Sequence, residues 1–235
     1  MRKSNLIKLI SDKCSNIDEP DSHKLVTFLN PYSYQVARRN IGIFAEFHEI
    51  HCDGIALVLA LRLFRFSITR RSFDMTSVAR DVLSEANDAR FTVFLIGSTQ
   101  PECEAAASAI KKAYPCIRMI GFRSGYFSNN MERNNTLDLI KSLNPKIVIA
   151  GMGAPIQEKF LLDLSLIGWR GHGYTCGGFI HQLANSGITY YPKIFDKLNL
   201  RWLYRIIKEP KLLRRYLLIY PLFIPLFIKD LLTKP

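Results

Sequence analysis

The sequence predicts an α/β fold, a Rossmann-like three-layer core built on a mainly parallel sheet, followed by a helical C-terminal segment. Short apolar runs rich in β-branched and aromatic residues recur along the chain, as is typical of buried parallel strands. Stretches with helical spacing separate these runs, which indicates alternating strands and helices. Beyond residue 190 the pattern changes first to amphipathic and then to wholly apolar sequence.

The expected elements follow one another in a regular order. Strands are expected at residues 24–29, 91–97, 117–121 and 146–151, and helices at 100–115 and 134–145. The second helix ends at an Asn-Pro pair, which is a helix stop signal. A chain of 235 residues has room for one such domain with a well-buried core. We therefore assign residues 1–190 to the α/β core and residues 191–235 to a C-terminal appendage.

The appendage combines positive charge with apolar sequence. Its first part predicts an amphipathic helix, with basic residues on one face and apolar residues on another. The two sets are Lys197, Arg201, Arg205 and Lys208, and Leu198, Trp202, Leu203, Ile206 and Ile207. Residues 193–235 hold ten basic and three acidic residues, which is +7 of the net charge of +12. The run from Tyr216 to Ile228 is uncharged, but two prolines interrupt it, and it is shorter than the roughly 20 residues of a membrane-crossing helix. We expect residues 214–235 to bind an anionic membrane surface, and we expect no nucleic-acid binding. The alternative is that the tail packs on the core or against another subunit.

Cysteine usage and the N-terminus bear on the compartment. The chain has five cysteines, an odd number, and no C-x-x-C pair, which indicates a reducing cytoplasm. Lys8 and Asp12 break the apolar pieces of the first residues, so a signal peptide is not predicted. A cytoplasmic protein that binds peripherally to the inner face of the plasma membrane is expected.

The stretch "FHEIHCDG" holds residue types that bind metals and act as bases. His48 and His51 do not have the H-E-x-x-H spacing, and no distant Cys or His pair completes a zinc site. Asp53-Gly54 fits a turn between two elements. Alternatively, Asp53 lies at the end of a strand and accepts a proton from a hydroxyl group.

The stretch "GMGAPIQEKF" follows a predicted strand and opens a helix. Gly151 and Gly153 would let the helix direct its N-terminal amides at a diphosphate. Ile156 stands where G-x-G-x-x-G has its third glycine, so classical dinucleotide binding is disfavoured. An ordinary strand-to-helix turn explains the pattern equally well.

Two further observations limit the chemistry. Cys176 is near His172 and His181 in the sequence, yet a small core cysteine explains it better than a nucleophile. The chain lacks a D-x-D pair, so we expect no metal and no cofactor. Arginine, lysine and helix termini would then stabilise any departing diphosphate.

Taken together, these motifs resemble the WecG/TagA/CpsF glycosyltransferase family, family 26 of the glycosyltransferases. The resemblance extends over nearly the whole chain, and its motifs occur in the family's order. They are "LNP" (29–31), Asp53-Gly54, "RRSFDM" (70–75), "VFLIGS" (93–98), "YP" (114–115), "GYF" (125–127), "GMGAPIQE" (151–158), "GG" (177–178) and "RWLYRIIKEP" (201–210).

The resemblance implies an inverting, metal-independent transferase. It would move a hexose of the N-acetylmannosamine type or a related one from a UDP-sugar to a polyprenyl-diphosphate-linked sugar in cell-surface polysaccharide synthesis. Asp53 maps to the family's proposed base. The substrate-binding residues it implies, with the glycines of the turn described above, are Asn30, Arg71, Gly151, Gly153, Gln157, Arg205 and Arg215.

The chain departs from the family pattern at several positions. Phe28 stands where the family has a threonine, and Ile156 stands where it has a lysine. In the appendage, Arg201 replaces a glutamate and Leu212 replaces an arginine. The block around Phe73 lacks the family's glycine. The exact sugar is therefore not carried over. A UDP-sugar epimerase-like enzyme and a catalytically inactive membrane adaptor are the alternatives, and the sequence leaves a homo-oligomer open.

Overall fold

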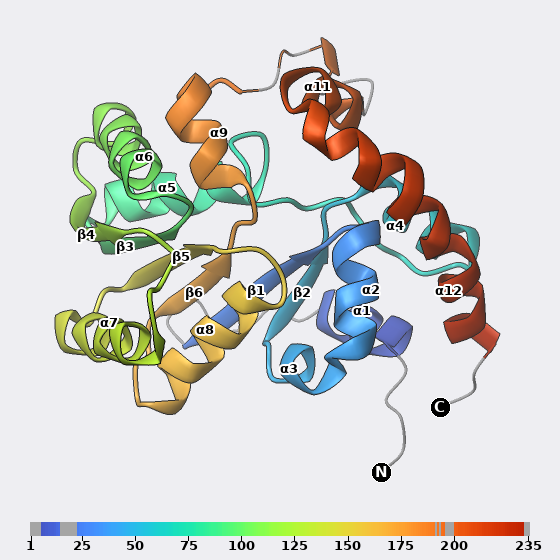
Figure 1. The fold of residues 1–235 in the computed structure, drawn as a ribbon, viewed down its shortest axis with the longest axis horizontal. Coiled ribbons are helices and arrows are strands. Elements are labelled where there is room, and N and C mark those ends of the chain that lie inside the picture. The colour runs from blue at the N-terminus through green and yellow to red at the C-terminus, as the bar shows by residue number, and fades with distance from the viewer. Residues whose placement is uncertain (1–5, 15–22, 191, 193, 196–199, 233–235) are drawn as a thin grey trace.

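The computed structural model describes residues 6–14, 23–190, 192, 194–195 and 200–232, and its centre is one parallel sheet of six strands (Figure 1). The strands lie in the order β2-β1-β6-β5-β3-β4. Their bounds are β1 (Lys24–Leu29), β2 (Glu49–Cys52), β3 (Thr92–Gly97), β4 (Arg118–Arg123), β5 (Ile147–Gly151) and β6 (His172–Thr175).

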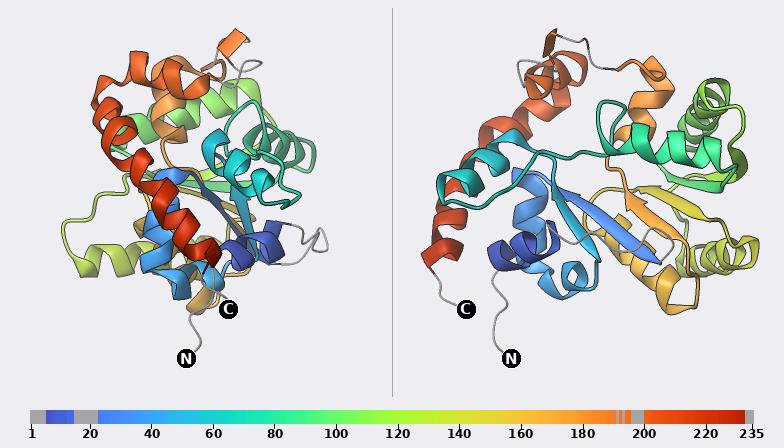
Figure 2. Two further views of the ribbon diagram at one scale, coloured as in Figure 1. Left: turned by 90° about the vertical axis from the view of Figure 1, so that its right-hand side faces the viewer. Right: turned by 180° about the vertical axis from the view of Figure 1, so that it is seen from behind.

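Helices cover both faces of the sheet and its β2 edge (Figures 1 and 2). One face carries α5 (Val78–Asp88), α6 (Gln100–Ala113) and α9 (Phe179–Ser186). The other face and the β2 edge carry α1 (Leu6–Cys14), α2 (Pro31–Arg39), α3 (Ile41–Ala45), α4 (Ile55–Leu63), α7 (Asn130–Leu143) and α8 (Ile156–Leu166). The predicted three-layer α/β fold with a parallel sheet is therefore confirmed.

The two apolar layers follow from side-chain alternation along the strands. In β3, Val93 and Leu95 point to the α5, α6 and α9 layer, whereas Phe94 and Ile96 point to the opposite layer. All four side chains are buried. Continuous apolar runs such as this one are what a strand covered on both faces requires.

The predicted strands match β1, β3, β4 and β5, and the predicted helices match α6 and α7. Two strands, β2 and β6, were not predicted. Both have only four residues, and β2 coincides with the "EIHC" part of the stretch considered for metal binding. Short strands that contain His and Gly carry too weak an apolar signal to be recognised from sequence.

The C-terminal segment is helical, and its last helix packs on the core (Figure 2). It consists of α11 (Arg201–Lys208), η1 (Pro210–Leu212), the π-helical turn η2 (Arg215–Ile219) and α12 (Tyr220–Leu232). Lys197 and Leu198, which the sequence assigned to the amphipathic helix, lie outside the described residues.

The buried face of α12 joins the core through rings and charges. Phe223 and Phe227 are buried, and the Phe223 ring lies 5.2 Å from that of Tyr34 on α2. Asp230 accepts hydrogen bonds from the Tyr34 hydroxyl at 2.8 Å and from Arg38 Nη2 at 2.7 Å. Contacts with α2 therefore extend along α12 from Phe223 to Asp230, which is about two turns.

Candidate active site

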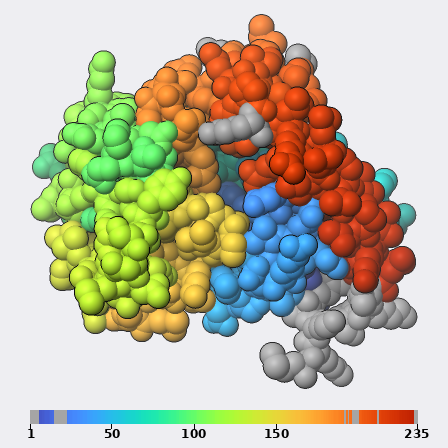
Figure 3. Space-filling model, in the orientation of Figure 1, coloured from blue at the N-terminus to red at the C-terminus, as the bar shows by residue number. Residues whose placement is uncertain are grey.

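A pocket of about 1180 Å³ lies at the carboxyl edge of the sheet, where the C-terminal helices approach the core. The space-filling view shows the red C-terminal segment against the blue and yellow parts of the core, with a hollow between them (Figure 3). Loops after β1, β2, β5 and β6 form one wall of the pocket, and α11, η2 and the start of α12 form the other. Ligands of open α/β sheets bind at this edge.

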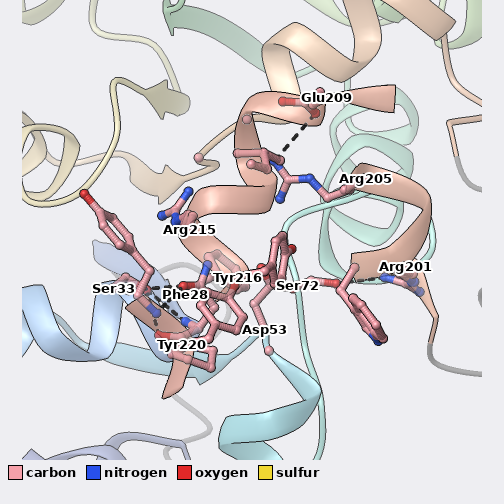
Figure 4. Close-up of a pocket in the computed structure, with 18 of the residues that line it drawn as sticks. Phe28, Ser33, Asp53, Ser72, Arg201, Arg205, Glu209, Arg215, Tyr216 and Tyr220 are labelled. Carbon is pink, nitrogen blue, oxygen red and sulfur yellow. Dashed lines mark hydrogen bonds and ion pairs between the residues drawn. The ribbon is translucent and has the colours of Figure 1, made fainter. Parts of the chain in front are cut away.

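Asp53 follows β2 directly and lines the pocket (Figure 4). Its backbone N–H donates to Leu29 O at 2.8 Å, which continues the pairing of β1 with β2 and places Asp53 beside Asn30. The next residue must be glycine, because a Cβ atom on Gly54 would come within 2.7 Å of Pro31 Cδ. This close approach of two loops brings Asp53 and Asn30 to the same wall.

The surroundings of Asp53 favour a base. Its side chain is 34% exposed, and because Asp53 lines the pocket, we take this exposed part to face the pocket. The enclosing walls remove water and raise the pKa of Asp53; Asp74 adds to the rise, while Arg70 and Arg205 oppose it. Arg70 Nη2 lies 4.0 Å from Asp53 Oδ1, and Arg70 Nε donates to Asp53 O at 2.8 Å. A carboxylate of raised basicity is thus held in place.

Asn30 has a structural role as well as a position on the pocket wall. Its Oδ1 accepts hydrogen bonds from the backbone N–H groups of Tyr32 at 3.0 Å and Ser33 at 3.1 Å, so it caps α2. Ser33 Oγ accepts from the Asn30 N–H at 2.8 Å in return. The predicted substrate residue is therefore fixed by the helix that it caps.

Gln157 is buried and connects two loops of the pocket wall. Its Oε1 accepts from the N–H groups of Gly153 and Gly177, both at 3.2 Å, and its Nε2 donates to Glu158 Oε1 at 3.0 Å. Glu158 is fully buried, and burial raises its pKa. Because Gln157 occupies both glycine N–H groups, these two donors are already engaged within the protein. The sequence had assigned Gln157 and Gly153 to substrate binding.

Gly151 ends β5 but does not line the pocket. A Cβ atom there would come within 2.8 Å of Cys176 Sγ and 2.9 Å of Gly177 O. Gly151 therefore permits close packing between the loops after β5 and β6. Gly153 is the glycine of this turn that reaches the pocket wall.

The opposite wall supplies the positive charge. Arg215 lines the pocket and lies over the Tyr32 ring, with its Cζ 3.6 Å from the ring centre. Its Nε atom is buried and has no hydrogen-bond partner among the described residues. Arg205 lies against Gly178, with Nη2 3.8 Å from Glu209 Oε1. Two of the predicted substrate residues therefore meet at the pocket.

The sequence had assigned Arg71, the second of two consecutive arginines, to substrate binding. Arg70 lines the pocket beside Asp53, whereas Arg71 is exposed and does not line it. The two residues follow one another, and successive side chains of an extended segment point in opposite directions. The isolated bridge between Cys52 and Arg70 is the structural signal that selects Arg70.

Aromatic residues of η2 and α12 were not singled out from the sequence. Tyr216 and Tyr220 both line the pocket, with ring centres 4.4 Å apart. Burial raises the pKa of Tyr220, and the charges of Tyr216 and Asp53 add to the rise. The two rings form an apolar surface close to the carboxylate (Figure 4).

The two histidines considered for metal binding and the cysteine considered as a nucleophile make structural contacts. His48 Nδ1 accepts from Leu25 N at 3.0 Å, and His51 Nε2 lies 2.7 Å from Glu49 Oε2. Cys176 is buried, and burial raises the pKa of its thiol, as for a core cysteine. In the part of the chain that the structure describes, no three His, Cys, Asp or Glu residues are placed to hold a metal ion.

An α/β sheet with a carboxylate at its carboxyl edge and arginines across the pocket is an arrangement suited to transfer of a group from an anionic leaving group. The family model "Glycosyl transferase WecG/TagA/CpsF family" matches residues 2–235. The chain belongs to this family, and it is a glycosyltransferase.

Two curated relatives are informative. The chain is 36% identical over 234 residues to the UDP-Gal:alpha-D-GlcNAc-diphosphoundecaprenol beta-1,4-galactosyltransferase of Shigella boydii. The match covers 98% of this chain and 96% of the relative. It is 28% identical over 160 residues to the N-acetylglucosaminyldiphosphoundecaprenol N-acetyl-beta-D-mannosaminyltransferase of Bacillus subtilis (strain 168). That match covers 67% of this chain and 60% of the relative.

Proposed function

We propose that this protein transfers a hexose from a UDP-sugar to a sugar linked to a polyprenyl diphosphate, with inversion, during synthesis of a cell-surface polysaccharide. The observation that carries the proposal is Asp53, a carboxylate of raised pKa in a pocket whose opposite wall holds Arg205 and Arg215. The names of both relatives describe transfer to a sugar on diphosphoundecaprenol. Family membership favours a transferase over the epimerase and adaptor alternatives.

In the proposed reaction, the hydroxyl oxygen of the acceptor attacks the anomeric carbon of the donor sugar. The bond from that carbon to the UDP oxygen breaks, and its electron pair leaves with UDP. Asp53 takes the hydroxyl proton as the new glycosidic bond forms. A single displacement inverts the anomeric centre.

The negative charge that develops on UDP needs stabilisation without a metal. Arg205 and Arg215 supply positive charge from the helical wall, and Arg70 lies on the Asp53 side. The N–H groups of Gly153 and Gly177 are bonded to Gln157. The side chains of the C-terminal helices therefore have the main part in holding the diphosphate.

Product analysis by mass spectrometry tests the proposal. The full-length protein is incubated with UDP-galactose, UDP-N-acetylmannosamine or UDP-glucose, and with a short-chain prenyl-diphosphate N-acetylglucosamine. A product heavier by one residue of the donor sugar, formed in the presence of the lipid acceptor, is expected. Conversion of the donor to its epimer without the acceptor, detected by chromatography because epimers have equal mass, would instead support an epimerase.

We further propose that α12 docks the enzyme on the anionic cytoplasmic face of the plasma membrane. Phe223 and Phe227 face the core, yet the outward residues of α12 are apolar except for Lys229. The exposed apolar side chains include Leu222, Ile224, Ile228 and Leu232. Further exposed apolar side chains are Leu59 and Leu63 of α4 and Phe64, which follows α4 and contacts Phe227. A helix that is apolar all round needs cover on both sides. Among the described helices, none is both long and apolar enough to cross a membrane.

Outward substitutions test this docking better than removal of the C-terminus, which would also strip Phe223 and Phe227 from the core. The variant Leu222→Glu/Ile228→Glu should lose flotation with phosphatidylglycerol vesicles while remaining folded. The control Leu139→Glu/Leu166→Glu places the same charges on exposed leucines of α7 and α8. Equal flotation of both variants would contradict the proposal. High salt should release little wild-type protein, because burial of a few apolar side chains, about 1.5 to 3 kcal/mol each, exceeds the charge contribution.

A further inference from the structure

Helix α11 is attached through a buried ion pair in addition to half-buried apolar side chains, such as Tyr204, whose ring lies 5.6 Å from that of Tyr190. Among its eight residues, all of which the structure describes, the only buried one is Arg201. Surface helices normally attach through an apolar face. Here the exposed fraction of Arg201 is 8%, and its Nη1 donates to Asp74 Oδ2 at 2.7 Å.

The core side of this ion pair is rigid. Asp74 is also 8% exposed, and its Oδ1 accepts from the Thr76 N–H at 2.9 Å and from Thr76 Oγ1 at 2.6 Å. Ser72 Oγ donates to Asp74 Oδ2 at 2.7 Å. Phe73 anchors the same segment, with its ring centre 5.3 Å from that of Phe179 and 5.8 Å from that of Phe28.

The pair joins two parts of the active site. The segment that holds Asp74 begins at Arg70, which bonds to the backbone of Asp53. On the helix side, Arg205 lies one turn after Arg201 and therefore on the same face of α11. Arg205 reaches the pocket against Gly178, where a Cβ atom would come within 3.2 Å of its Nη2. Figure 4 shows Arg201, Arg205 and Asp53 around the one pocket.

We propose that Arg201 and Asp74 form a buried ionic latch that fixes α11 across the pocket and so positions Arg205 for sugar transfer. Both are positioning residues, since the latch acts through Arg205. The inference rests on the glycosyltransferase function proposed above.

A buried ion pair is a poor source of net stability, because removing two charges from water costs about as much as their attraction returns. A buried ion pair instead favours one position of the helix. Any position that separates the two partners leaves a buried charge without compensation, which is strongly unfavourable. Apolar contacts are less directional than a hydrogen-bonded ion pair, so the pair restricts the position of α11 more closely. Because small displacements of charged groups have large effects on catalysis, a fixed position for Arg205 is the benefit that the latch provides.

A double-mutant cycle tests the latch. Arg201→Met removes the helix partner, and Asp74→Asn removes the core charge but retains an oxygen for Thr76. Each single variant should lower kcat/KM roughly 10- to 100-fold, mainly through kcat. The kcat/KM of the double variant should be no lower than that of the less active single variant, because the pair acts as a unit. Arg201→Lys should restore most of the activity, whereas Arg80→Met and Asp81→Asn, in an exposed pair on α5, should have no effect.

Hydrogen exchange gives a readout independent of turnover. Backbone amides of residues 201–208 should exchange faster in Arg201→Met, while those of β3 and β5 remain as in the wild type. If the wild-type protein transferred no sugar, the proposed function would be refuted. The hydrogen exchange of residues 201–208 would still show whether the ion pair fixes α11. If an active wild type tolerated Arg201→Met, or if only Arg201→Met and not Asp74→Asn reduced activity, the latch would be wrong and Arg201 would have a separate role.

Discussion

The two walls of the pocket differ in how their polar groups are used. On the sheet wall, Asn30 caps α2 and Gln157 bonds to two glycine N–H groups and to Glu158. On the helical wall, Arg215 lies over Tyr32, and its Nε has no hydrogen-bond partner among the described residues. The hydrogen bonds of the sheet wall thus join its own loops and helices, whereas the helical wall contributes the arginines. A carboxylate facing positive charge across a pocket is the arrangement that the proposed transfer from a diphosphate requires.

Phe223→Ala tests whether the helical wall belongs to the folded core, and it should have the largest effect. Phe223 is buried against Tyr34, so its loss should reduce the free energy of unfolding by about 3–5 kcal/mol. Urea denaturation would measure this. Ile224→Ala, at the exposed neighbouring position, should change the free energy by less than about 0.5 kcal/mol. Similar values for the two variants would mean that α12 is not packed as described.

Asp53→Asn tests the sheet wall as the source of the base. The catalytic rate should fall roughly 100-fold or more, while UDP binding and the fold remain nearly intact. Steady-state kinetics and calorimetry would measure the two effects.

The pH profile adds a second test of Asp53. Only the ionised carboxylate accepts a proton, so wild-type activity should fall as the pH drops through the pKa of Asp53. Because burial raises that pKa, the fall should come at a higher pH than for an ordinary aspartate. Wild-type turnover by a folded Asn variant would remove Asp53 from the mechanism.

Arg215→Met tests the helical wall as the site of charge binding. Loss of a charge-assisted contact to the diphosphate should lower kcat/KM about 10-fold. Arg215→Lys should recover only part of this loss, because lysine keeps the charge but not the planar stacking on Tyr32. Arg170→Met, at an exposed position on the opposite edge of the sheet, is the matched control. If the control lost as much activity, the effect would not be local.

Treatment with EDTA should leave the transferase activity unchanged. Arginine side chains take the place of a metal in the proposed mechanism, and the sequence has no D-x-D pair. Activity measured with and without the chelator should agree. A strict requirement for added Mg²⁺ or Mn²⁺ would show that the arginines of the pocket do not stabilise the leaving group without a metal.

Sequence patterns sufficed for the fold class and for strands with continuous apolar runs, such as β3 and β5. They did not suffice for β2 and β6, whose four residues include histidine or glycine. For the site, Asp53 was considered both as part of a turn and as a residue at the end of a strand, although β2 itself was not among the predicted strands. Which of Arg70 and Arg71 lines the pocket was not predictable, since it depends on which side of an extended segment faces the pocket.

Long-range contacts set a further limit on sequence reasoning. The Arg201–Asp74 pair joins residues 127 positions apart, and no local pattern encodes it. The two faces of α12 were also hidden: membrane docking and packing on the core were treated as rivals, yet the helix buries Phe223 and Phe227 and still exposes an apolar face.

The bonds between α2 and α12 also bear on how the protein is made. Tyr34 and Asp230 are 196 residues apart, so α2 leaves the ribosome long before the residue to which it bonds. Domains start to fold from the N-terminus during translation, and contacts of long sequence separation form late. A nascent chain that ends before α11 therefore lacks the helical wall of the pocket. The pocket is complete only after the two distant parts of the chain have packed together.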